Sequence, residues 1–116
     1  MLAAPWRSYL AIDASQPENA LPIARHVYAH YVLHELSSLP FYPTWYDEGL
    51  AELLCTLHRD GDIIRVGEVP VGRAQWLLLG TPLSLRRMLT ARDMLRWPVN
   101  RMSMFYAQSW ALAHFF

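Results

Sequence analysis

The sequence predicts a single domain, residues 1–116, of the mostly helical α+β class. Helical periodicity runs through long segments without a breaker, whereas strand-like alternation is confined to two short stretches. Hydrophobic residues make up 53% of the chain, which is enough to form a core and excludes a disordered tail or linker. The length suits one compact domain, so we expect no division into separate units.

Charge is spread unevenly along a chain whose net charge is zero. Residues 1–70 carry four Arg against nine acidic residues, and residues 71–116 carry six Arg against Asp93 alone. Because Arg pairs readily with carboxylates, we expect the two halves to pair with each other. This expectation disfavours nucleic-acid binding, since apolar residues interrupt the arginines that such binding would use, namely Arg86, Arg87, Arg92, Arg96 and Arg101.

Targeting signals are not visible in the sequence. The first seven residues lack the basic stretch before an apolar core that a signal peptide needs. Uninterrupted apolar runs are only a few residues long, far short of a membrane span. With Cys55 as its single cysteine, the chain cannot form an internal disulfide. We therefore expect a soluble domain.

The first elements along the chain are a short strand and a long helix. Arg7–Ile12 alternates polar and apolar residues and predicts the strand, and Asp13–Asn19 is typical of a turn. The helix is predicted over residues 20–36, with Asn19 as its N-cap and Pro22 in its first turn, where a missing N–H is tolerated. Apolar residues lie nearly all the way round it, which is typical of a helix buried in the middle of a domain.

A proline-containing loop, residues 37–43, separates this helix from a second one. Thr44 is typical of an N-cap, and Asp47 follows three residues later as in a capping box. These signals predict a second helix over residues 45–57, which ends in a turn at His58–Gly61.

Beyond this turn, Gly and Pro divide the chain into shorter elements. Asp62–Gly67 predicts a short strand, one arm of a hairpin, and short helices are predicted at Leu83–Leu89 and around Met94. The last helix, Arg101–Phe116, is apolar and has no polar end. We therefore expect a minimal or truncated domain, a fragment of a longer chain whose last helix packs against a partner or a missing segment.

Two histidines on the first helix are candidates for chemistry. His26 and His30 are four residues apart, so they stand on one helical face, about 6 Å apart along the axis. This spacing lets both imidazoles bind one metal ion without bending the backbone. His34 extends the row by a turn, so His30 and His34 form a competing pair. A hydrogen-bonded histidine in the core is the alternative for each of them.

Two glutamates repeat this spacing on the second helix. Glu48 and Glu52 share a face, and burying a carboxylate is costly unless it is paired or binds a metal ion. They therefore either complete a metal site with the histidines or pair with arginines of the second half. Gly49 lies between them and costs about 1 kcal/mol relative to Ala in a helix. We expect another helix to approach closely at this glycine.

Three motifs resemble, in the same order, those of the gluzincins, the peptidase MA-like zinc metallopeptidases. Arg25–Leu33 resembles their H-E-Y-x-H segment, Pro43–Leu53 their W-x-x-E-G-x-A-E helix, and Phe105–His114 the Y-A-Q-S-W helix of a largely uncharacterised bacterial branch. The resemblance implies a zincin-like (gluzincin) catalytic-domain core. In such a fold an extended peptide adds to a sheet edge, and only the two short predicted strands could supply that edge here.

The resemblance also assigns roles at matching positions. It implies that His26, His30 and Glu48 bind one zinc ion (Zn2+) and leave the fourth position to water. It implies that Glu52 orients one of the two imidazoles from behind. Tyr106 would approach the site from the last helix, where it would either only pack or act as a catalytic residue that stabilises an oxyanion.

One position departs from the family pattern. The residue after the first zinc ligand should be Glu, the general base that takes a proton from water, and here it is Val27. Valine cannot accept a proton, and the loss of a positioned base costs a factor of roughly 10² to 10⁴ in rate. Neither Asp47, assigned to the helix cap, nor Glu35, on a different face, replaces it.

Three hypotheses for the function follow. The first is a zinc-binding metallopeptidase-like domain that acts on a peptide or protein if active, and that is weak or inactive because of Val27. The second is a working hydrolase in which another group supplies the base. The third is a metal-free structural or protein-interaction domain with a degenerate metal site.

Overall fold

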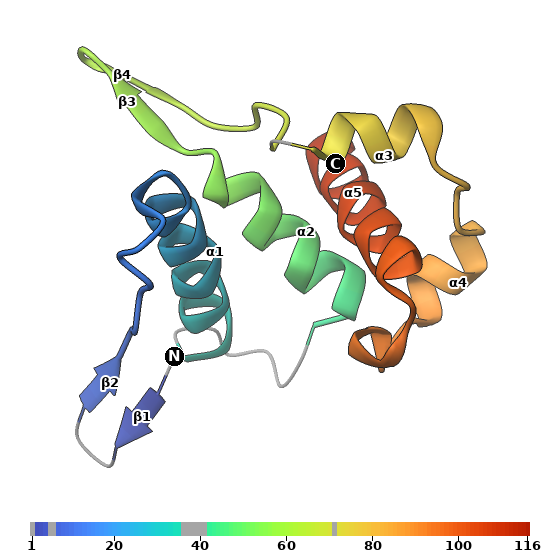
Figure 1. Cartoon of the computed structure of the whole chain (residues 1–116), viewed down its shortest axis with the longest axis horizontal. Coiled ribbons are helices and arrows are strands. Elements are labelled where there is room, and N and C mark those ends of the chain that lie inside the picture. The colour runs from blue at the N-terminus through green and yellow to red at the C-terminus, as the bar shows by residue number, and fades with distance from the viewer. Residues whose placement is uncertain (1, 5–6, 36–41, 71) are drawn as a thin grey trace.

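The computed structural model describes residues 2–4, 7–35, 42–70 and 72–116 (Figure 1). In these residues helices predominate and the strands form two separate antiparallel pairs, which confirms the predicted mostly helical α+β class. The elements are β1 (Leu2–Ala4), β2 (Arg7–Tyr9), α1 (Pro17–Glu35), α2 (Thr44–Cys55), β3 (His58–Asp60), β4 (Ile63–Arg65), α3 (Arg73–Leu79), α4 (Leu85–Thr90), the 3-10 turn η1 (Met94–Arg96) and α5 (Val99–Phe115).

Helix α1 begins earlier than its sequence pattern predicts. Its first residue is Pro17, because the fixed φ and missing N–H of proline suit the first position of a helix. Asn19 is therefore not an N-cap, and its backbone N–H donates to the carbonyl oxygen of Gln16 at 3.0 Å. Pro22 lies in the second turn rather than the first, where it removes the N–H that would bond to the carbonyl oxygen of Glu18.

Helix α2 starts directly after a proline. Thr44 is its first residue and Pro43 is the N-cap, whose carbonyl oxygen accepts the N–H of Asp47 at 3.0 Å. No side chain caps this end, so the predicted cap formed by Thr44 with Asp47 is wrong, and the Asp47 carboxylate is available to α1. The helix ends at Cys55, two residues before its predicted end. The predicted loop 37–43 lies outside the described residues except for its last two.

Helix α2 lies between α1 and α5, and it crosses α5 at Gly49 (Figure 1). A Cβ at this position would collide with the carbonyl oxygen of Ser109 and lie 3.0 Å from the Cβ of Ala113. Glycine is thus needed for the two helices to approach, which confirms the expected close contact. This crossing fixes α2, and with it the row of carboxylates that α2 presents to α1.

The apolar core lies on the far side of α2 from α1. Met88 on α4, Met94 on η1 and Phe105 on α5 are buried in one cluster. The predicted short helices at 83–89 and around Met94 are α4 and η1, shifted by at most two residues. Ser84 caps α4, because its hydroxyl oxygen accepts the backbone N–H of Arg87 at 3.2 Å.

The strands are short and form two hairpins rather than one sheet. In the second hairpin β3 pairs with β4 around a turn at Gly61, whose φ of 62° favours glycine. His58–Asp60 is a strand rather than the predicted turn, because Gly61 and Asp62 make the reversal themselves. In the described part of the chain, none of the helices combines the length and apolar character that crossing a bilayer requires.

Candidate metal centre

Helices α1 and α2 bring the predicted ligands together. His26 and His30 project from successive turns of α1, and Glu48 projects towards them from α2. The Nε2 atoms of the two histidines lie 3.1 Å apart. The Oε2 atom of Glu48 lies 3.3 Å from Nε2 of His26 and 3.4 Å from Nε2 of His30. Three donor atoms from three side chains therefore form a nearly equilateral triangle.

The size of this triangle suits a zinc ion. Zinc binds imidazole nitrogen and carboxylate oxygen at about 2.0–2.1 Å, so two ligands of a tetrahedral site stand roughly 3.3 Å apart. The three observed separations, 3.1, 3.3 and 3.4 Å, are close to that value. A fourth position, on the open side of the triangle, would remain for another ligand.

Carboxylates stand behind both imidazoles. The Nδ1 of His30 donates to Oδ1 of Asp47 at 2.8 Å, and the Nδ1 of His26 lies 3.3 Å from Oε1 of Glu52. With its hydrogen on Nδ1, a neutral ring directs the Nε2 lone pair into the triangle, as in carboxylate–histidine–metal groups. The resemblance implied this role for Glu52. The matching role of Asp47 on His30 was not expected, because its position suggested a helix cap.

One atom of the triangle has no hydrogen bond. Oε2 of Glu48 is buried and, despite its two imidazole neighbours, makes none in the described structure. A buried acceptor of this kind is rare because its desolvation is not compensated. A metal ion between the two imidazole nitrogens and this oxygen would supply the missing partner. The residues present therefore fit a bound metal ion.

When no metal is bound, a proton on an imidazole compensates for the negative charge of the carboxylates in this cluster. The hydrogen bond to Asp47, helped by Glu48, raises the pKa of His30 to about 9. Burial alone would raise the pKa of Glu48, but the imidazoles of His26 and His30 outweigh it and lower this pKa to about 2. The metal-free cluster is thus an imidazolium held by carboxylates, and a metal ion must displace its proton.

A second group of possible ligands shares His30. Nε2 of His34 lies 2.8 Å from Oδ2 of Asp47, whose other oxygen accepts from His30. His30, His34 and Asp47 are therefore close enough to hold an ion of their own. However, Nε2 of His30 faces His26 and Glu48, so the structure favours the pair His26 and His30 for one ion.

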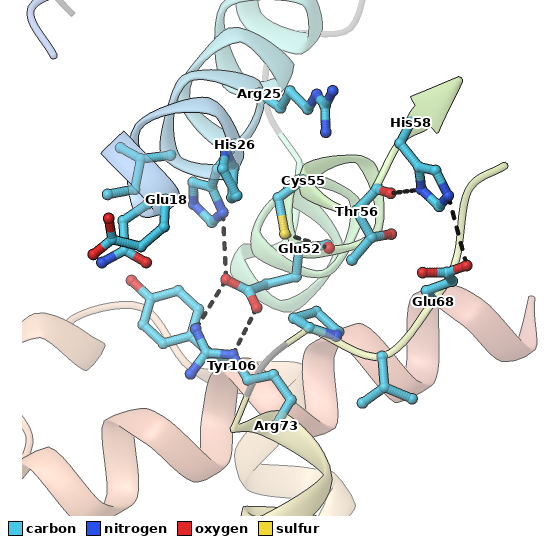
Figure 2. A pocket seen from close by; sticks show the side chains of 15 residues that line it. Glu18, Arg25, His26, Glu52, Cys55, Thr56, His58, Glu68, Arg73 and Tyr106 are labelled. Atoms are coloured by element: carbon cyan, nitrogen blue, oxygen red, sulfur yellow. Dashed lines mark hydrogen bonds and ion pairs between the residues drawn. The ribbon is translucent and has the colours of Figure 1, made fainter. Parts of the chain in front are cut away.

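Glu52 is held from both sides. Arg73, at the start of α3, donates through Nε to Oε2 of Glu52 at 2.6 Å and through Nη2 to Oε1 at 3.0 Å (Figure 2). Glu52 therefore contacts both a histidine and an arginine. Among the residues that the structure describes, this is the one ion pair between an arginine of the second half and an acid of the first. Beyond this pair, the expected pairing of the two halves is wrong for the described residues, because the other five arginines of the second half make no ion pair there.

Tyr106 reaches the centre from α5. Its ring centroid lies 6.3 Å from that of His26, and the guanidinium of Arg73 lies 5.0 Å above the ring. Figure 2 shows the phenol on the side of the cavity that also carries His26 and Glu52. This cavity has a volume of about 610 Å³. Burial, helped by the charge of Glu48, raises the pKa of Tyr106 to about 12, so the phenol keeps its proton.

Neither Val27 nor the carboxylates that α2 presents to α1 offer an unengaged base at this centre. Val27 is half-buried on α1 and offers no polar atom. The three carboxylates that α2 presents here, Asp47, Glu48 and Glu52, each already contact an imidazole. Comparison with known proteins found no matching family model, no similar curated protein and no similar solved structure. The resemblance to the gluzincins therefore rests on the three motifs.

Proposed function

We propose that the chain binds one zinc ion through His26, His30 and Glu48, in a zincin-like domain that is weak or inactive as a peptidase. The observation that carries this proposal is the triangle of three donor atoms 3.1–3.4 Å apart, one of them a buried carboxylate oxygen without a hydrogen bond. Imidazole and carboxylate together suit zinc, which is the default metal for such a set.

The low activity follows from what the remaining residues can do. Zinc supplies a water of lowered pKa, near 7, when it is bound in a site with an open position. Val27 can neither accept a proton from that water nor orient it. Tyr106 keeps its proton and faces the cavity, so its hydroxyl can donate to a substrate carbonyl. The chain thus has a group to polarise a peptide, and it lacks a base at the position where the resemblance places one.

The test is the zinc content of the purified protein, measured by elemental analysis after dialysis. We expect one zinc per chain in the wild type and none in His26→Ala or Glu48→Ala. His58→Ala is the matched control, since His58 lines the same cavity but contacts Glu68 rather than the triangle. A wild-type protein that stays free of zinc after reconstitution would contradict the proposal.

One observation favours the metal-free alternative. Ion pairs of Asp47 with two histidines and of Glu52 with Arg73 join α1, α2 and α3 without any metal. A domain with a degenerate site would be stable through these contacts alone. Equal melting temperatures with zinc and with a chelator, together with zinc-free protein, would favour a structural or protein-interaction role.

A further inference from the structure

A second cavity, of about 370 Å³, lies beside α3, α4 and the start of α5, away from the metal centre. Two guanidinium groups, two hydroxyls, one amide and an indole line it, from Arg87, Arg101, Ser84, Thr81, Asn100 and Trp76. The described residues that line it include no Asp or Glu, whereas Glu18, Glu52 and Glu68 line the first cavity. Its chemistry is that of a site for an anion.

Neither arginine of this cavity is engaged with an acid. In the part of the chain that the structure describes, Arg87 and Arg101 make no ion pair. The guanidinium of Arg87 stacks over Trp97 at 5.1 Å, which holds it in place and leaves its in-plane N–H groups free. A planar guanidinium with free N–H groups matches two oxygens of a phosphate.

The cavity lies in a region that is basic as a whole. We call residues 84–101, which form α4, η1 and the first turn of α5, the basic lobe (Figure 1). It holds five Arg and one acid, Asp93. The three arginines outside the cavity are exposed and also make no described ion pair; they are Arg86, Arg92 and Arg96. This charge has no complement within the described protein.

Aliphatic side chains stand exposed among these arginines. Leu85, Leu95 and Val99 are 60%, 76% and 72% exposed. A surface that mixes exposed aliphatic residues with arginine is typical of proteins that lie on an anionic membrane, where the aliphatic groups enter the boundary of the acyl chains. Single-stranded nucleic acids are bound mainly by exposed aromatic rings, and the aromatic side chains here, Trp76 and Trp97, are only half-exposed.

We propose that the basic lobe binds the surface of an anionic phospholipid membrane, with a headgroup phosphate in the cavity between Arg87 and Arg101. The other arginines of the basic lobe add long-range attraction, and its exposed aliphatic residues add contact with the bilayer. This role is independent of the metal centre, because His26, His30 and Glu48 do not line this cavity.

The test is co-sedimentation of the full chain with vesicles of phosphatidylglycerol or of phosphatidylcholine. We expect binding to the first, decreasing with salt, and little binding to the second. The double variant Arg87→Gln/Arg101→Gln should bind about 25-fold more weakly, at about fivefold for each arginine. Arg59→Gln/Arg65→Gln is the matched control, because it removes the same charge from the β3–β4 hairpin and should bind as the wild type does.

Two outcomes would overturn the proposal. They are equal binding to the two lipids, and equal loss in the control and the Arg87→Gln/Arg101→Gln variants. A separate variant distinguishes lipid from nucleic acid. Leu95→Ser should weaken vesicle binding severalfold, and tighter binding to single-stranded RNA that Leu95→Ser leaves unchanged would show a nucleic-acid surface instead. Unaltered melting temperatures show that all variants fold.

Discussion

Among the described residues, charged side chains are paired in the candidate metal centre and unpaired in the basic lobe. In the metal centre, Asp47, Glu48 and Glu52 each contact at least one imidazole, and Arg73 completes the group. In the basic lobe, five arginines make no described ion pair. Half-buried charges need partners within the fold because desolvation is costly, whereas exposed charges do not. The pairing of charges in each region thus follows their burial.

Apolar packing differs between the same two regions. Helix α1, which carries the histidines, has Ala29 as its one buried residue. Helix α5 buries Phe105, Ala107 and Trp110, and its core continues into α4 and η1. The metal centre is therefore held largely by polar contacts between α1 and α2, and the basic lobe stands on an apolar core. Changes in charge should affect the stability of the first region much more than that of the second.

The largest effect is expected from a carboxylate added to the metal centre. Val27→Glu places an acid after the first ligand, where it has no histidine partner of its own and can act as a base. We expect peptide hydrolysis by the zinc-loaded variant to rise by roughly 10² to 10⁴ over the wild type. Val27→Gln is the control of equal size without a base. A folded, zinc-loaded Val27→Glu protein no faster than this control would count against a peptidase-like site.

The next prediction compares how much the free energy of unfolding falls when a paired arginine and an unpaired arginine are each replaced. Arg73→Gln leaves the carboxylate of Glu52, which is 5% exposed, without its guanidinium partner, and should lower the free energy of unfolding by about 3 kcal/mol. Arg86→Gln, in the basic lobe, should change it by less than about 0.5 kcal/mol. Denaturant unfolding of both variants measures the difference. Equal values would show that Arg73 contributes no more than a surface residue.

A third effect is a pH dependence of the metal-free protein. The folded pKa of His30, about 9, lies above its ordinary value of 6.5, so the resulting stabilisation is complete below pH 6.5 and is lost as the pH rises through 9. In the presence of a chelator, the free energy of unfolding should therefore fall between these two pH values. His30→Gln should remove most of this slope. An unchanged slope in that variant would assign the titration to another group.

Local sequence signals predicted the helices better than they predicted the contacts between side chains of different helices. The three long helices were found from periodicity, and Gly49 was correctly assigned to a close helix contact because its helical cost needs a reason. Asp47 was assigned to a cap because spacing along one helix says nothing about a facing helix. Arg73 lies 21 residues from Glu52, and no periodicity links them. Tertiary contacts of this kind follow from packing, which a single sequence does not display.

Pro22 also bears on how the first cavity is entered. With no N–H to offer, it leaves the opening turn of α1 one backbone hydrogen bond short, and that turn carries Glu18 and Asn19 on the cavity wall. Local opening starts where such bonds are fewest. The start of α1 is therefore the part of this cavity wall where we expect local opening to begin, ahead of the turns that carry His26 and His30.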